Sequence, residues 1–436
     1  MRNVFLFLCM AALVALVGFS QSWSLALAIV NLCIISAIMS LGVNIQWGYA
    51  GLLNVGIMGF VALGGLAAVL VSMPPVTEAI NVGGSGIAIS ALVIAATFIA
   101  MVWLYRRKPF PGRRILITLV GIAGLMLARH FYGPASAAIE AVDPAATGNL
   151  GGLGLPIVIS WFVGGLFAAA AAWAVGKISL GLRSDYLAIA TLGISEIIVA
   201  VLKYEDWMTR GVKNVSGLPR PVPYEVNLQK EVWVADMAQR YGLTIQDVSS
   251  LTVKLAYAAL FMVVLLVVLY LSEKALKSPW GRMMRAIRDN EVAAEAMGKD
   301  VKGRHLQVFI LGSAVIGVAG AMLTTLDGQF TPASYQPLRF TFLIWVMVIV
   351  GGSGNNWGAV LGGFVVWFFW IEAEPIGLWL MDFITSGMAE DSGLRQHLLK
   401  SAAHMRLMTM GLVLLLVLRF TPKGLIPERS NNRPGK

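Results

Sequence analysis

The chain has 436 residues, of which 58% are hydrophobic and only 13% charged, and its mean hydropathy is +0.76. Because soluble domains carry about 25% charged residues, these values exclude an ordinary soluble globular protein. The formal net charge of +10 falls in short clusters between apolar runs, without a basic stripe carrying interleaved aromatic residues, so nucleic acid is not expected as a partner.

Apolar runs recur along nearly the whole chain, and many approach the roughly 20 residues with which an α-helix crosses a bilayer. Length and hydropathy predict about twelve transmembrane helices, over residues 4–20, 25–47, 50–72, 86–104, 115–130, 156–176, 185–202, 252–272, 306–326, 340–352, 357–372 and 407–420. We therefore predict an all-α polytopic membrane protein with about 10 to 12 transmembrane helices. It would form a single domain over residues 1–425, followed by a tail over 426–436.

Two of these segments allow a second interpretation. The first run follows Arg2 and also suits a signal peptide, but a retained helix is preferred because further apolar runs follow at once. The runs on either side of residues 351–354 are short, so half-helices or a re-entrant hairpin would also fit there. Cys9 and Cys33 lie within apolar runs and match neither a disulfide framework nor a metal site, so no metal is expected.

Glycine density between Gly48 and Gly59, together with the polar Asn44, Gln46 and Asn54, predicts an interrupted helix beside a cavity. Most other glycines within the apolar runs are expected to allow close packing between helices, because small residues let two backbones approach in lipid.

The charged loops predict the topology. With the N-terminus inside, the basic clusters all fall on the cytoplasmic side, as the positive-inside rule requires; they lie within residues 106–114, 177–183, 274–304 and 419–433. The loops over 131–155, 203–251 and 373–404 then fall outside, and they are acidic or mixed in sign. Both termini are therefore expected in the cytoplasm.

The largest basic loop has the pattern of two short helices. Ser278 is a good N-cap, and Pro279 suits the first helical position. Asn290 can cap a second helix, at whose positive N-terminal end Glu291 is favourable, and Gly298 suits the left-handed residue that ends it. From the residues alone, this segment is equally a docking surface for another protein or a basic loop resting on anionic lipid headgroups.

The segment Glu291–Gly298 resembles the EAA loop of ABC-importer permeases, the cytoplasmic contact of a separate ATPase subunit. Further segments resemble, in order, motifs of the branched-chain amino acid permease family, LivM type: Leu41–Gly56, Ser184–Ile197, Asn214–Pro219, Val350–Gly362 and Arg419–Leu425. This ordered set covers roughly two thirds of the chain. In the external motif, Arg210 and Lys213 stand where small or polar residues are expected. Residues 86–150 look like an added helix pair, and residues 371–404 like an extended external loop.

The resemblance implies a permease subunit with type II importer-like packing in a bacterial inner membrane. It further implies a homologous second permease, two cytoplasmic ATPase subunits and a periplasmic binding protein as partners, besides membrane lipid and a small-molecule substrate. No phosphate-binding G-x-x-x-x-G-K-[ST] loop occurs, so ATP and Mg would bind to the partner ATPases and this chain would carry no cofactor. The residues expected to couple to the ATPases are Arg282, Arg285, Arg288, Glu291, Ala294 and Gly298.

No nucleophile elbow, HExxH or paired-cysteine pattern is present, so we expect no enzymatic activity of this chain itself. Candidates for lining a translocation pathway are Asn44, Gly51, Asn54, Gly56, Thr191 and Glu196. A charge at bilayer depth is costly, so Glu196 would line the pathway or accept a hydrogen bond between helices, for example from Thr191 or Asn44.

The substrate expected from the resemblance is a branched-chain amino acid, while urea, short amides or another small solute would suit the same machinery. An ion-driven secondary transporter is disfavoured because carboxylates do not cluster in the apolar runs. A membrane scaffold without transport is a further alternative. The loop over 203–251 is either a docking surface for the binding protein or a solvated loop with an interfacial helix.

Overall fold

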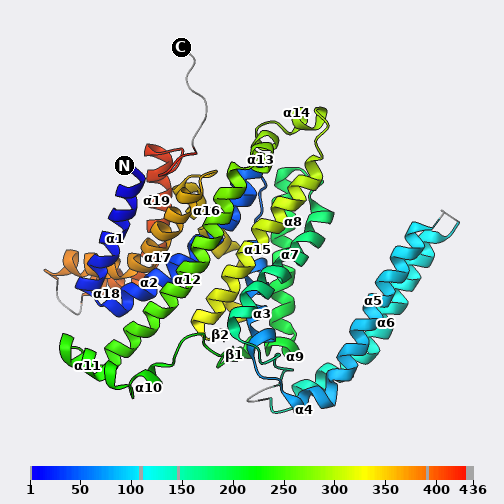
Figure 1. The fold of residues 1–436 in the computed structure, drawn as a ribbon, viewed down its shortest axis with the longest axis horizontal. Helices are drawn as coiled ribbons and strands as arrows, with labels where there is room; N and C mark the ends of the chain where they lie inside the picture. The colour runs from blue at the N-terminus through cyan, green and yellow to red at the C-terminus, as the bar shows by residue number, and fades with distance from the viewer. Residues whose placement is uncertain (1, 108–110, 145–147, 389–391, 429–436) are drawn as a thin grey trace.

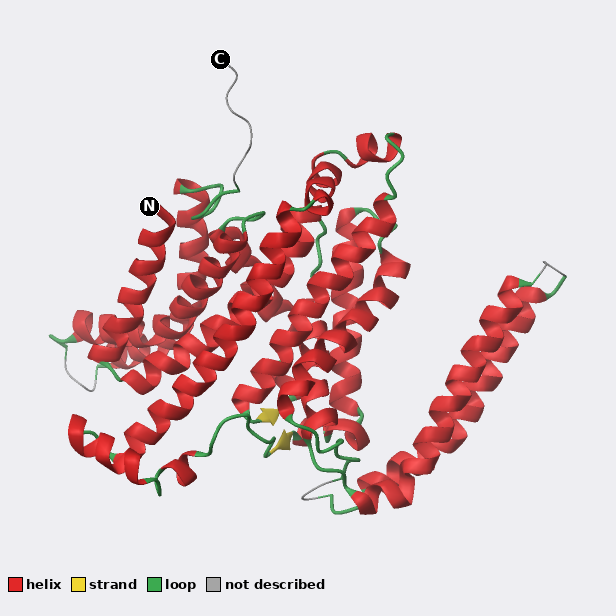
Figure 2. Cartoon of the chain, in the orientation of Figure 1, coloured by secondary structure: helices red, strands yellow, loops and turns green. Residues whose placement is uncertain are grey.

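The computed structural model describes residues 2–107, 111–144, 148–388 and 392–428, and helices make up most of it (Figures 1 and 2). Each predicted span overlaps one long helix: α1 (Arg2–Ser20), α2 (Trp23–Val43), α3 (Ile57–Ser72), α5 (Ser85–Arg106), α6 (Arg113–Glu140), α7 (Ile157–Ser179), α8 (Ser184–Tyr204), α12 (Ile245–Lys277), α15 (Val301–Asp327), α16 (Pro337–Gly351), α17 (Asn356–Thr385) and α19 (Met405–Phe420). The spans predicted over 25–47 and 50–72 also include residues 44–56, which lie between α2 and α3.

Within the described residues, nine helices are long and apolar enough to cross a membrane, or ten if the bent pair of α18 (Gly393–Ser401) and α19 counts as one span. Helices α3 and α16 are apolar but shorter. The prediction of a helical polytopic membrane protein is confirmed.

Shorter elements connect these helices: η1 (Asn44–Gly48), α4 (Thr77–Ala79), η2 (Ile80–Gly84), α9 (Asp206–Thr209), η3 (Gly211–Lys213), β1 (Val215–Ser216), α10 (Glu225–Leu228), α11 (Val232–Tyr241), α13 (Pro279–Asp289), α14 (Glu291–Ala296), β2 (Gln329–Phe330), η4 (Pro332–Ser334) and η5 (Ala402–His404). The strands β1 and β2 are antiparallel, with Val215 opposite Phe330 and Ser216 opposite Gln329.

The core of the molecule is formed by α2, α3, α15 and α17, which are apolar on all sides and therefore bury most of their surface. Glycines allow these helices to touch. A Cβ atom on Gly64 would collide with the carbonyl of Gly317, and one on Gly320 would collide with the backbone of Val61. This is the close approach that small residues permit between helices in lipid.

Helices α5 and α6 form a hairpin that stands apart from the bundle (Figure 1). They pack on each other, and Ser90 donates a hydrogen bond to the carbonyl of Ala128 at 3.1 Å. The hairpin meets the rest of the chain at its base, where Trp207 Nε1 donates to the hydroxyl of Tyr132 at 2.7 Å and Tyr132 in turn bonds to Glu205. A helix pair is therefore present in the expected region, and it stands beside the bundle.

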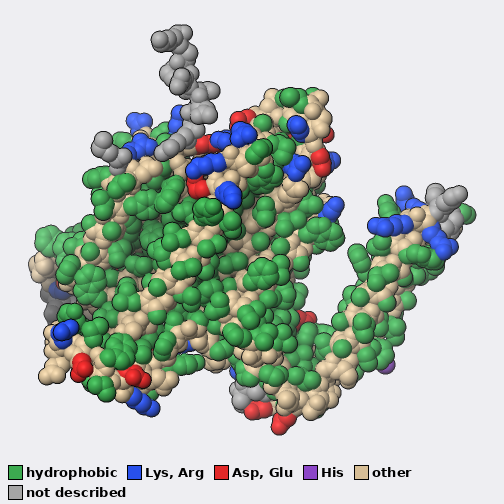
Figure 3. Space-filling model, in the orientation of Figure 1, with side chains coloured by type: hydrophobic (Ala, Val, Ile, Leu, Met, Phe, Trp, Pro, Cys, Tyr) green, Lys and Arg blue, Asp and Glu red, His purple; other side chains and the backbone are tan. Residues whose placement is uncertain are grey.

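Basic residues form clusters at one end of the molecule, whereas at the opposite end Lys and Arg lie beside Asp and Glu (Figure 3). Figure 3 shows Lys and Arg around α13 and α14 and at the tip of the α5–α6 hairpin, with a largely apolar zone below them. The start of α1 and the end of α19 lie toward the same end (Figure 1). This arrangement agrees with the charge pattern, and the predicted cluster residues Lys108, Arg429 and Arg433 lie outside the described residues.

Three boundaries differ from the prediction. The loop expected over 373–404 is largely helical, because α17 continues through Pro375 to Thr385 and α18 follows. Likewise, α12 begins at Ile245, inside the expected external loop. The chain after α19 is not a free tail throughout, because the amide of Ile426 donates to the carbonyl of Gly351 at 2.9 Å and its side chain is buried.

Candidate functional site

The first feature of the site is an interruption between α2 and α3. Helix α2 widens into the π-helical turn η1, the backbone leaves the helix over residues 51–56, and α3 starts at Ile57. Gly51 takes a φ of +70°, which a residue without Cβ adopts at little cost. The predicted interruption is confirmed, and it needs partners because backbone groups released inside a membrane cannot bond to water.

Polar side chains supply those partners from α8 and from the interruption itself. Thr191 Oγ1 accepts from the amide of Val55 at 3.0 Å, and Ser195 Oγ accepts from the amide of Gly59 at 2.8 Å. Asn54 Oδ1 accepts from the amide of Gly56 at 2.9 Å. A Cβ on Gly56 would collide with the carbonyl of Thr191, so this glycine lets α8 approach the interruption.

A second network ties the interruption to α15. Gln46 is fully buried, and its Nε2 donates to the carbonyl of Phe309 and to Ser313 Oγ, both at 2.9 Å. Its Oε1 accepts from Asn54 Nδ2 at 2.9 Å. Buried polar groups that are fully bonded fix one arrangement of the backbone. Gln46 and Asn54 therefore hold η1 and the interruption against α15.

A third network of hydrogen bonds surrounds Asn356, the first residue of α17. Its Oδ1 accepts from Asn44 Nδ2 at 3.1 Å and from the hydroxyl of Tyr49. Its Nδ2 donates to Glu273 of α12 at 3.0 Å. Asn44 Oδ1 also accepts from the amide of Gly354 at 2.8 Å. Three helices thus meet through one buried amide side chain.

The second feature of the site is the helix pair α13–α14, which projects at the basic end of the molecule (Figure 1). Both predicted caps are present: Ser278 Oγ accepts from the amide of Gly281 at 3.3 Å, and Asn290 Oδ1 accepts from the amide of Ala293 at 2.9 Å. Gly298 takes a φ of +77° and ends the second helix. The local structure of the pair therefore follows the sequence signals.

The two helices differ in how they are anchored. Met284 and Ile287 of α13 are buried against the bundle, as is Ala294 of α14. In contrast, Val292 and Met297 are 77% and 78% exposed. Together with the exposed Glu291, they leave α14 with an uncovered, partly apolar surface, and such surfaces mark protein contacts when they lie outside the membrane.

The three arginines of α13 separate into two groups. Arg282 is exposed. Arg285 lies 3.8 Å from the carboxylate of Glu428, and Arg288 lies 3.0 Å from it. Arg288 also donates to the carbonyl of Gly48, the last residue of η1. This arginine therefore connects the projecting helix pair directly to the interrupted helix and to the segment after α19.

The predicted pathway residues do not all come together. Asn44, Gly51, Asn54, Gly56 and Thr191 surround the interruption, where the side chains of Asn44 and Asn54 are fully buried and bonded.

Glu196 instead is exposed on α8. It lines an open groove with Lys203, Gln336 and Arg339, near the end of the bundle opposite α13–α14. Its carboxylate does not bond to Thr191 or Asn44 in the described structure.

Sequence reasoning missed three members of the site. Glu273, Asn356 and Glu428 bond to site residues that are far away in the chain. Asn356 lies within the resembling segment Val350–Gly362, and this was the available signal for it. Among the described residues, no group of three or more His, Cys, Asp or Glu side chains could hold a metal ion.

The sequence matches known proteins in the same region. A family model described as "Branched-chain amino acid transport system / permease component" matches residues 134–418. This range contains the helix pair α13–α14 and Asn356. It begins within α6, so α5 and the interruption after α2 precede it.

Individual relatives carry the same description. The high-affinity branched-chain amino acid transport system permease protein LivM of Escherichia coli (strain K12) is 30% identical over 257 residues, which make up 58% of each chain. The probable branched-chain amino acid transport permease protein LivM of Methanocaldococcus jannaschii is 24% identical over 396 residues, or 90% of each chain. The probable permease protein LivH of the same organism is 33% identical over 111 residues, covering 25% of this chain and 34% of that one.

This chain thus spans somewhat more than half the length of the Escherichia coli relative. No solved structure matches it. The family model covers more than half of the chain and includes α15, α17 and the projecting helix pair, but not the partners of α15 and α17 at the interruption. The chain therefore belongs to the family of branched-chain amino acid transport system permease components.

Proposed function

We propose that this chain is the transmembrane permease subunit of an ATP-driven ABC importer for branched-chain amino acids. Its partners would be a homologous second permease, two cytoplasmic ABC ATPase subunits that bind ATP and Mg, and a periplasmic substrate-binding protein. The bundle would lie in a bacterial inner membrane with both termini in the cytoplasm, and it would pack with the second permease as in type II importers. The chain itself would catalyse no reaction.

One observation supports this proposal most strongly. The exposed helix α14 belongs to a pair whose first helix reaches, through Arg288, the carbonyl of Gly48 at the interrupted helix. An ATPase that moves α13–α14 would therefore act on the point where the transmembrane backbone is already broken. In this arrangement Glu291, Ala294 and Gly298 shape the docked surface, while Arg285 and Arg288 transmit its displacement.

The second permease would cover Glu196. A carboxylate on the outer surface of a membrane helix is costly when it faces lipid, whereas the groove around it also contains Lys203 and Arg339. Polar groups at this surface would meet the partner permease or water in a shared pathway. Thr191 lies on the opposite, buried face of the same helix, so it supports the interruption rather than touching that partner directly.

The loop over 203–251, which we expect outside the membrane, contains the amphipathic helix α11. Helix α11 exposes Val232, Trp233, Met237 and Tyr241, a pattern of an amphipathic helix lying in the interface. The binding protein would dock beside it. Crosslinking from Trp233→Cys to a cognate binding protein tests this contact, and an absence of crosslinks would leave α11 as an interfacial helix.

The test of the proposed function is uptake of labelled leucine in a strain lacking this chain, complemented with the wild type or with Gly298→Val. Rescue by the wild type only, unaffected by excess unlabelled urea, is the expected result. Unimpaired leucine uptake in the uncomplemented strain would contradict the assignment of leucine as a substrate. Competition by urea would instead indicate that the substrate is urea or a short amide. Loss of uptake by an uncoupler at constant ATP would indicate an ion-driven transporter instead.

A further inference from the structure

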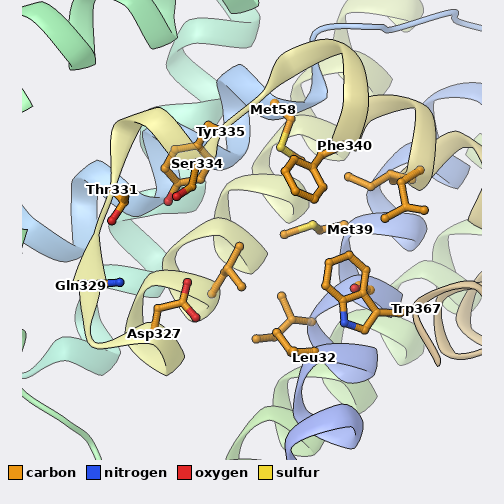
Figure 4. Close-up of a pocket in the computed structure, with 15 residues that line it drawn as sticks. Leu32, Met39, Met58, Asp327, Gln329, Thr331, Ser334, Tyr335, Phe340 and Trp367 are labelled. Carbon is orange, nitrogen blue, oxygen red and sulfur yellow. The ribbon is translucent and has the colours of Figure 1, made fainter. Parts of the chain in front are cut away.

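A cavity of about 270 Å³ opens at the end of the bundle opposite α13–α14 (Figures 1 and 4). It lies between α2, α3, α16 and α17, and the segment from the end of α15 through η4 forms its mouth. It is lined by Leu32, Ile35, Ser36, Met39, Met58, Leu323, Asp327, Gln329, Thr331, Ser334, Tyr335, Phe340, Leu343, Ile344 and Trp367.

The lining has two chemically different parts. Figure 4 shows Asp327, Gln329 and Thr331 on one side, and Leu32, Met39, Phe340 and Trp367 on the other. The first part carries a carboxylate, an amide and a hydroxyl, whereas the second is aliphatic and aromatic. A ligand that fills both must have a polar end and an apolar end.

Several polar groups in this lining have no partner among the described residues. Thr331 Oγ1 and Trp367 Nε1 are buried and unbonded. Asp327 is instead exposed at the mouth, where its carboxyl group has neither an ion pair nor a hydrogen bond to the described residues. Buried polar atoms are almost always bonded, and each unbonded one is unfavourable. The unbonded Thr331 Oγ1, on the same side of the cavity as the exposed Asp327 and Gln329, indicates that the polar end of a ligand binds on this side.

Tyr335 shows the contrasting case in the same lining. Its hydroxyl bonds to Thr324 at 3.0 Å, so the fold satisfies this group by itself. Asp327 carries the only carboxyl group among the described lining residues. No Lys, Arg or His stands among the described lining residues, so this carboxyl group favours a ligand that carries a cation at its polar end.

We propose that this cavity is a binding site within a single permease subunit for a free α-amino acid with an uncharged, branched aliphatic side chain. The ammonium group bonds to Asp327, the carboxylate accepts from Gln329 and Thr331, and the side chain packs against Met39, Phe340 and Ile344. The inference rests on the proposed function and deepens it, because it places substrate recognition in this chain as well as in a binding protein.

The size of the cavity supports this ligand class. At about 30 Å³ per molecule in the liquid, the volume corresponds to roughly nine waters, which suits a solute of about that many non-hydrogen atoms, such as leucine. Urea and glycine would leave the apolar part empty. A lipid chain would leave Asp327 and Thr331 without partners.

The test uses the full chain in nanodiscs with Ser334→Cys as a reporter at the mouth, in a Cys9→Ser background because Cys9 is exposed. The rate of modification by a methanethiosulfonate reagent is measured against L-leucine concentration. We expect leucine to slow modification and Asp327→Asn to raise the half-protecting concentration at least about tenfold, as loss of a charged hydrogen bond implies. The matched control is Asp236→Asn on α11, an exposed carboxylate outside the cavity, which should leave protection unchanged.

Analogues of leucine and a variant with a filled cavity test the two parts of the site separately. Isoamylamine, which keeps the ammonium group and the branched chain, should protect more weakly than leucine, while isovalerate, glycine and urea should not protect. Ile344→Trp should abolish protection but leave the modification rate without ligand unchanged, which shows that the fold is retained. Equal protection by glycine would overturn the role of the apolar part. A reporter that stays blocked in nanodiscs without leucine and is released in detergent would indicate bound lipid and overturn the proposal.

Two failures are distinguishable. Normal leucine uptake by the complete transporter, with no protection of the reporter and no effect of Asp327→Asn on uptake, would refute the cavity as a substrate site and leave the proposed function standing. Protection of the reporter in a chain whose deletion does not impair leucine uptake would refute the proposed function and leave the cavity's ligand class standing.

Discussion

The connection made by Arg288 can be tested by a double-mutant cycle with Glu428. Arg288→Gln removes three charged contacts: one to the carboxylate of Glu428 at 3.0 Å, one to the carbonyl of Gly48, and one to the adjacent, exposed Asp289 at 3.3 Å. The Asp289 contact is exposed and contributes little. A hydrogen bond to a charged group contributes about 1.5–3 kcal/mol when buried. About a quarter of each of the two charged side chains is exposed, so screening reduces the ion-pair part.

We therefore expect Arg288→Gln to lower the free energy of unfolding by about 2–3 kcal/mol. Glu428→Gln should cost about 1 kcal/mol, and the coupling energy between the two sites should be about 1 kcal/mol. Steric trapping of the purified chain in bicelles measures all three. Arg282→Gln is the matched control, because Arg282 is exposed on the same helix and has no ion pair in the described residues.

A second readout separates stability from coupling. In the proposed transporter, Arg288→Gln should reduce leucine uptake more than it reduces ATP hydrolysis, since the proposed ATPases would still dock on α14 but their motion would no longer reach Gly48. A coupling energy indistinguishable from zero, together with an unchanged ratio of uptake to hydrolysis, would refute the connection. An equal loss in Arg282→Gln would show that the charge of α13 matters and not the bridge.

Three further substitutions test other parts of the site. Gly298→Val forces a branched residue to a φ of +77°, which costs about 1–2 kcal/mol of local strain. Membrane insertion of this variant should persist, while pull-down of the proposed ATPases should weaken. Asn356→Leu leaves Glu273 and the other bonded partners of this amide unsatisfied and should lower the unfolding free energy by at least about 2 kcal/mol. Gly320→Ala overpacks α15 against α3 and should lower the free energy of unfolding by about 1–3 kcal/mol. The control is Gly193→Ala, whose new Cβ atom meets no neighbour and which should change that free energy by less than about 0.5 kcal/mol. Thermal unfolding in detergent compares the two variants.

Local features of this protein could be predicted because their causes are local. The positions of the spans follow from hydropathy, and the caps at Ser278 and Asn290 follow from side chains that bond to amides three residues away. The left-handed turn at Gly298 and the interruption after Gly48 follow from residue types in the same way. The motif resemblance added the family, which the comparisons confirm.

The predicted lengths of long helices are too short where the helices contain polar residues. Helix α17 passes Glu372, Glu374 and Pro375 without ending. The hydropathy of this stretch resembles that of a loop, but Glu372 is buried and bonded to Gln21, and Glu374 pairs with Arg406. The partners that stabilise these carboxylates lie on other parts of the chain, so no local sequence pattern indicates them.

The sequence by itself determined the membrane class, the helices, the basic end and the short-range turns, because each depends on the properties of neighbouring residues. Only the tertiary structure decided which polar residues meet. It joined Asn356 to Asn44, brought Arg288 to Gly48 and Glu428, and turned Glu196 outward. These contacts bridge residues that are dozens to hundreds of positions apart. Their geometry is set by how glycine-lined helices pack, which no single segment of the chain contains.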